Sequence, residues 1–91
     1  MRTIVLDGAY MTDKDAAYTY IAKRMEFPSY FGKNLDALYD LLTEPCPQTQ
    51  IVIYHKDMML NSLGYYGQRI LDTFRDALRI NANLMYVEDS E

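Results

Sequence analysis

Residues 29–45 read SYFGKNLDALYDLLTEP and combine a loop with a short amphipathic segment. Leucines at helical spacing predict one buried face, at positions 35, 38 and 42. Pro45 and Pro47 cannot continue a helix, so we expect the helix to span about Asn34 to Thr43.

The opposite face of this helix carries Asp36, Asp40 and Glu44 at four-residue spacing. Like charges at this spacing destabilise an isolated helix by a few tenths of a kcal/mol, and an acid at the C-terminus opposes the helix dipole. Aromatic residues flank the acids at positions 30, 31 and 39. Aromatic anchors beside charges are typical of protein–protein contacts. A solvated acidic face with inward-packed aromatics is the alternative interpretation.

Outward from this segment, three short apolar runs predict strands: TIVL (3–6), IVIY (51–54) and LMYV (84–87). Each run is continuous, which is typical of parallel strands covered on both faces. Asp7 and Gly8 follow the first run as a turn signal.

Helical segments fill the intervals between the runs. We expect one helix from about Asp13 to Met25, with Thr12 as its N-cap and Asp15 as a capping partner. KDMMLNSLG (56–64) suggests one or two turns. The segment from Gln68 to Ile80 predicts a strong helix with a buried face at positions 70, 71, 74, 77 and 78. The sequence thus predicts one α/β domain over residues 1–91, a three-stranded parallel sheet packed with helices in two layers. The pattern leaves the strand order open.

The composition excludes several classes of protein. The chain has 91 residues and a net charge of −4, so it has no electrostatic reason to bind nucleic acid, and a basic partner is favoured. A single cysteine, Cys46, cannot form an internal disulfide and indicates a reducing compartment. The sequence has neither a signal-like start nor an apolar window that would span a bilayer, so we expect a cytoplasmic protein.

A family resemblance starts from the segment YFGKNLDALYDLL (30–42). It resembles the signature of the barstar family, small intracellular inhibitors of secreted guanyl-specific ribonucleases. RTIVLDG (2–8) is similar to the family's opening strand and turn, and TFRDAL (73–78) resembles a stretch of its last helix. The resemblance implies the barstar-like fold, which agrees with the fold predicted from the pattern.

The resemblance also implies a mechanism, in which the motif helix and the loop before it block a ribonuclease active site. Asp40 would take the place of an RNA phosphate, with Asp36 one turn away on the same rim. Tyr30 would cover a catalytic side chain, and Asn34 would order the start of the helix. The partner-binding residues implied in this way are Tyr30, Phe31, Asn34, Asp36, Tyr39, Asp40, Thr43 and Asp76.

The resemblance further implies that the partner is a basic, extracellular-type ribonuclease or a related toxin nuclease. We expect no direct contact with nucleic acid or membrane, no cofactor, and a monomer when the protein is free. An interaction or immunity module of the same fold, with a partner that is not a ribonuclease, is the alternative function.

Other candidate sites are weaker. His55 follows the second predicted strand, and a Cys46–His55 pair would suggest nucleophilic catalysis, but no third group is placed to orient it. One His and one Cys without ligand spacing do not predict a metal site. We therefore expect no enzymatic activity and no metal. On the last helix a shared solvent face predicts ordinary surface ion pairs, among Arg69, Asp72, Asp76 and Arg79.

Overall fold

The computed structural model describes residues 1–89, so residues 90 and 91 of the expected domain lie outside the described part. The elements in chain order are β1 (Arg2–Asp7), a 3-10 turn η1 (Gly8–Tyr10), α1 (Lys14–Met25), α2 (Leu35–Leu42), β2 (Thr49–Tyr54), α3 (Lys56–Leu63), α4 (Tyr65–Leu78) and β3 (Leu84–Glu88). This order confirms the predicted α/β class, with three parallel strands and helical crossovers.

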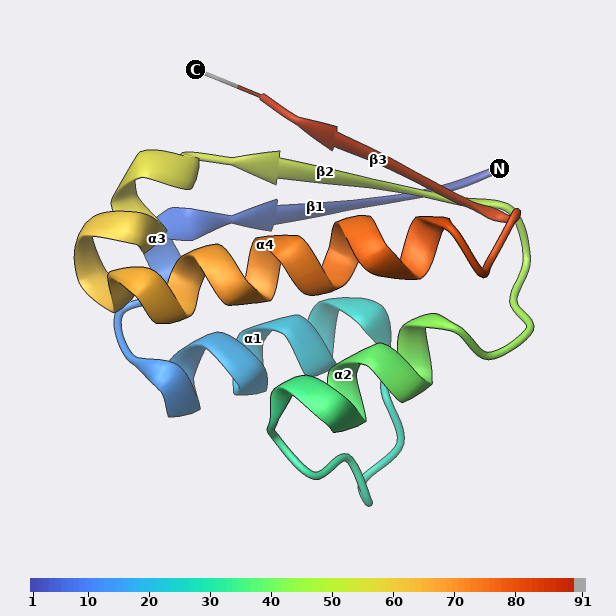
Figure 1. Cartoon of the computed structure of the whole chain (residues 1–91), viewed down its shortest axis with the longest axis horizontal. Helices are drawn as coiled ribbons and strands as arrows, with labels where there is room; N and C mark the ends of the chain where they lie inside the picture. Colours follow the sequence, from blue (N-terminus) through green and yellow to red (C-terminus); the bar gives the residue numbers. More distant parts are fainter. Residues whose placement is uncertain (90–91) are drawn as a thin grey trace.

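The strands form one parallel sheet in the order β1-β2-β3, which places β2 in the centre. Ile51 of β2 lies opposite Ile4 of β1 and Tyr86 of β3. Figure 1 shows α1, α2 and α4 on one side of the sheet, with α2 the farthest from the strands. The helix that carries the acidic column is therefore an outer element of the helical layer.

The expectation that both faces of the strands are covered is wrong. Alternate residues point into the helical layer and are buried: Ile4, Leu6, Ile51, Ile53 and Leu84. The residues between them face away from it, and Met85 and Val87 remain 50% and 44% exposed. Because the helices form a single layer, continuous apolar runs here mark a sheet with one covered face.

The helix starts also differ from the predictions. Asp13, and not Thr12, is the N-cap of α1, and its side chain accepts a hydrogen bond from the Ala16 amide at 2.8 Å. The last helix begins at Tyr65, three residues before the predicted start, because Gly64 adopts a positive φ of 60° that ends α3 and begins α4. Gly67 lies buried within α4 against α3, where an added Cβ would meet Leu63 at 3.2 Å.

The carboxyl ends of β1 and β2 meet closely. The Asp7 carboxylate accepts a hydrogen bond from the Ala9 amide at 2.9 Å and lies 2.8 Å from Nδ1 of His55. A Cβ at Gly8 would lie 2.2 Å from the carbonyl oxygen of His55, so only glycine fits between the two strand ends. The contact fixes how α1 and α3 leave the sheet.

Candidate protein-binding site

The start of α2 is fixed by its own loop. The Asn34 side chain accepts a hydrogen bond from the Ala37 amide at 2.7 Å and caps the helix, as expected for an asparagine at this position. Lys33 just before it has a left-handed φ of 53°, and its Nζ lies 3.2 Å from the Asp15 carboxylate on α1. These contacts hold the loop and helix start against α1.

The end of α2 is fixed from α4. Asn81, which is buried, donates hydrogen bonds from Nδ2 to the carbonyls of Leu42 and Glu44 at 3.0 and 3.1 Å. Thr43 donates from Oγ1 to the carbonyls of Tyr39 and Asp40, so its hydroxyl is used within the helix end. Backbone groups that a helix terminus leaves free are thus satisfied by side chains.

The buried and exposed faces of α2 agree with the predicted pattern. Leu38 and Leu42 are buried, whereas Asp36, Asp40 and Glu44 are exposed. Within residues 1–89, these three carboxylates have neither a hydrogen-bond nor an ion-pair partner. The folded chain therefore presents free negative charge along α2 and just beyond its C-terminal end.

A groove of about 340 Å³ lies on one side of this acidic column, between α2 and α4. Its lining brings together the predicted residues Asp36, Tyr39 and Asp76. The other lining residues are Leu35, Tyr65, Arg69, Asp72 and Thr73. The structure thus places Asp76 beside the motif helix, although the two lie far apart in the sequence.

A second groove, of about 230 Å³, lies on the other side of the column, between the loop and α2. It is lined by Tyr30, Phe31, Gly32, Ala37, Asp40, Leu41 and Glu44. Tyr30 is 75% exposed, whereas Phe31 is only 9% exposed and packs edge-on against Tyr18 with ring centroids 5.8 Å apart. Phe31 therefore belongs mainly to the core and supports the loop. Of the two rings, only that of Tyr30 is exposed and can contact a partner.

Sequence reasoning missed part of the first groove. Tyr65 is 78% exposed, and Arg69 and Asp72 line the groove with it. Residues 65, 69, 72 and 76 are three or four positions apart, so they lie on one face of α4. A helix predicted to begin at Tyr65 would have shown this shared face. Tyr65 lay outside the predicted helix, which began three residues too late, and Arg69 and Asp72 were predicted only as members of surface ion pairs.

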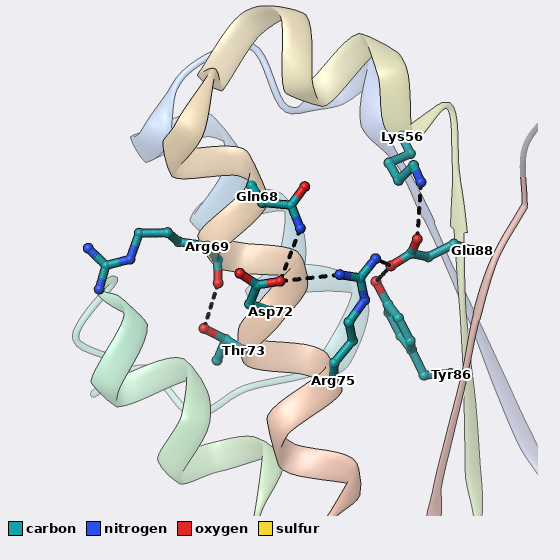
Figure 2. A network of polar contacts seen from close by, with 8 residues as sticks. All are labelled: Lys56, Gln68, Arg69, Asp72, Thr73, Arg75, Tyr86 and Glu88. Carbon is teal, nitrogen blue, oxygen red and sulfur yellow. Dashed lines mark hydrogen bonds and ion pairs between the residues drawn. The ribbon is translucent and has the colours of Figure 1, made fainter.

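Asp72 belongs to a network of polar contacts that joins α4 to β3 (Figure 2). Asp72 accepts hydrogen bonds from Gln68 at 3.0 Å and from Arg75 at 3.2 Å. Arg75 also pairs with Glu88 of β3, which accepts from Tyr86 and Lys56 as well.

Burial opposes the charge on Glu88, but these hydrogen bonds outweigh it and hold the pKa of the Glu88 carboxyl below its ordinary value. Asp72 thus forms an ion pair, but with Arg75 and not with Arg69 or Arg79 of the predicted solvent face, whereas Asp76 has no side-chain partner within residues 1–89. The side chain of Arg69 points away from this network (Figure 2). Asp76 is therefore the carboxylate that α4 leaves free beside α2.

The structure separates the two residues of the alternative catalytic pair. Cys46 precedes β2 and lies near Asn81, with Sγ 3.4 Å from Nδ2, whereas His55 follows β2 and pairs with Asp7. A six-residue strand spans about 20 Å. A Cys46–His55 nucleophile is therefore excluded by this fold.

Within residues 1–89, the His, Cys, Asp and Glu side chains form no group of three or more that could hold a metal ion. In the same part of the chain, no helix combines the length and the apolar character that crossing a bilayer requires.

The fold and this site define a small α/β protein that exposes a rigid acidic helix between two grooves. The family model for Barstar (barnase inhibitor) matches residues 1–86, and the chain belongs to the barstar family. It is 32% identical over 79 residues to the protein named "Putative ribonuclease inhibitor YrdF" of Bacillus subtilis (strain 168). That match covers 85% of this chain and 86% of the relative.

Proposed function

We propose that this protein inhibits a ribonuclease by placing the acidic face of α2 in the enzyme's phosphate-binding active site. The observation that carries the proposal is the set of unpartnered, exposed carboxylates of Asp36 and Asp40, which the capped helix holds in place. A ribonuclease must surround an RNA phosphodiester with cationic groups. Carboxylates presented to that cluster replace the phosphates, and complementary charge accelerates the encounter.

The two grooves suggest roles for the other residues. Asp40 and Tyr30 line one groove, which supports a role for Tyr30 in covering an enzyme side chain that meets Asp40. Asp36, Tyr39 and Asp76 line the other and extend the acidic surface toward α4. Asn34 and Thr43 act at the two ends of the helix, where their side chains bond to the backbone. Phe31 supports the loop from the core.

The proposed partner is a basic, extracellular-type ribonuclease or a related toxin nuclease. The proposed location is the cytoplasm of the producing cell, where the inhibitor would neutralise the enzyme before export or act as an immunity protein. The free thiol of Cys46 fits a reducing compartment. We propose that the free protein is a monomer without a cofactor and without enzymatic activity.

Titration of barnase activity with this protein tests the proposal. We expect inhibition at a fixed stoichiometry, and we expect Asp40→Ala to raise the inhibition constant by about thirtyfold or more, as for a central contact residue. Asp57→Ala is the matched control, because Asp57 is an exposed acid of α3, which Figure 1 shows far from α2. Full barnase activity at a large molar excess of wild-type protein would overturn this proposal and favour a partner that is not a ribonuclease of this kind.

A further inference from the structure

Glu44 is the acid of the column whose position is least favourable for folding. It lies just beyond Thr43, the C-cap of α2, where the helix dipole disfavours a negative charge, and it stands four residues after Asp40. No contact within residues 1–89 offsets this cost, because the Glu44 carboxylate has neither a hydrogen-bond nor an ion-pair partner there. The structure of the free chain therefore gives no folding reason for an acid at this position.

The backbone of Glu44 is nevertheless held on both sides. Its carbonyl accepts a hydrogen bond from the buried Asn81 at 3.1 Å, and its amide donates to the Leu41 carbonyl at 3.4 Å. Pro45 follows and restricts the conformation of the residue before it. Because the backbone at Glu44 is already fixed, only its side-chain torsions remain to be ordered when a partner binds, and less entropy is lost.

The groove beside Glu44 has a shape and chemistry that fit one kind of side chain. Ala37 and Leu41 give it an apolar wall, and the exposed ring of Tyr30 lies at its rim. Asp40 and Glu44 supply two carboxylates to the same groove. A methylene stem can pack on the apolar wall while a planar cation reaches both carboxylates and stacks on the ring.

We infer that this groove receives an arginine side chain from the rim of the ribonuclease active site, and that Glu44 is the residue that selects it. The inference rests on the proposed function, because it requires that α2 meets a ribonuclease. It adds a second contact to the one made by Asp40. A ribonuclease without a basic side chain at the corresponding place on its rim would be bound less tightly.

Association and dissociation rates of the complex with barnase test this inference. We expect Glu44→Gln to raise the dissociation rate about threefold to tenfold, because it removes a close charge pair while keeping the shape of the side chain. Asp57→Asn, which removes the same charge from α3, should change the association rate by less than about twofold and leave dissociation unaltered. Ala37→Leu fills the groove without a change of charge and should also speed dissociation.

The possible results separate the two proposals. If Asp40→Asn weakens the complex and Glu44→Gln dissociates at the wild-type rate, the groove assignment is overturned and the proposed function stands. If wild-type protein forms no complex with barnase, the proposed function fails and this inference fails with it. Thermal unfolding of Ala37→Leu verifies its fold, and Glu44→Gln decides alone if that variant is not folded.

Discussion

Asp40 lies one helical turn after Asp36 on α2, and Glu44 lies four residues further along the chain, beyond the helix end; all three side chains are exposed. Each carboxylate repels its neighbour, and the part of the chain that the structure describes supplies no cation to any of them. Asp36 is partly compensated because it lies in the first turn of α2, where the helix dipole favours an acid. Asp40 has acids on both sides and no such compensation.

The melting temperature of the free protein measures the cost of this repulsion among the carboxylates. We expect Asp40→Asn to stabilise the fold by a few tenths of a kcal/mol, a rise in melting temperature of about 1–2 °C. Asn34→Ala is the contrasting variant, because loss of the N-cap should destabilise by about 1 kcal/mol. A fall in the melting temperature of Asp40→Asn would show instead that this carboxylate stabilises the fold.

At the scale of the element, α2 is a short helix that depends on both of its ends. Asn34 holds its start and Asn81, from the end of α4, holds its last carbonyls. The first of these contacts is local and is visible in the sequence. The second joins residues nearly forty positions apart, so it is visible only once the helices are packed.

Asn81→Asp tests the second contact. The substitution keeps the size of the side chain but removes the donor that satisfies the carbonyls of Leu42 and Glu44. We expect a loss of about 2–3 kcal/mol in the free energy of unfolding, since polar groups are left unsatisfied near the core. Urea unfolding gives the value, and Asn61→Asp serves as a control at an exposed site on α3. Equal, small losses in both variants would contradict this account of the α2 end.

Asp7, at the carboxyl end of β1, makes a pH-dependent contribution to the free energy of unfolding. The hydrogen bond from the Ala9 amide, together with His55, holds the pKa of the Asp7 carboxyl below its ordinary value. A lowered pKa in the folded state means that the stabilisation is present above the unfolded pKa of about 4 and is lost as the pH falls through the folded value.

We therefore expect Asp7→Asn to destabilise by about 1 kcal/mol at pH 7 and by much less at about pH 2.5. Urea unfolding of wild type and variant at the two pH values measures the difference. A destabilisation that is the same at both pH values would show that the charge on Asp7 does not contribute.

Local signals predicted the elements well and their contacts poorly. The three apolar runs predicted the strands, and Asn34 with Pro45 bracketed α2, because these signals act within a few residues. Thr12 and Asp13 are both able to cap α1, and the sequence does not choose between them. The exposed face of the sheet and the groove between α2 and α4 arise from packing, so periodicity could not reveal them. Asp76 came from the family resemblance, and Tyr65 and Arg69 required the fold.

At the scale of the whole molecule, the net charge of −4 is accompanied by free acids on the helical layer. Asp36, Asp40 and Asp76 lie on elements that face away from the open side of the sheet (Figure 1). These free carboxylates therefore concentrate negative charge on the α2 side of the molecule, and we expect a cationic cleft to approach that side.

The rate of association with barnase should fall steeply as salt is added, because the charges that steer the encounter are exposed and are screened within about 10 Å at 0.1 M ionic strength. The dissociation rate should change much less with salt. Stopped-flow measurements from low to high salt separate the two rates. An association rate that does not depend on salt would contradict electrostatic steering by the acidic face.

If the acidic face of α2 occupies the place of the RNA phosphate, as we propose, a nucleotide bound in the active site must exclude the inhibitor. Competition with guanosine 3′-phosphate for binding to barnase measures this exclusion. We expect the apparent dissociation constant of the inhibitor to rise in inverse proportion to the fraction of barnase that the nucleotide leaves free, and we expect Asp40→Asn to bind weakly with or without the nucleotide. Wild-type binding that stays equally tight when barnase is saturated with the nucleotide would contradict this proposal.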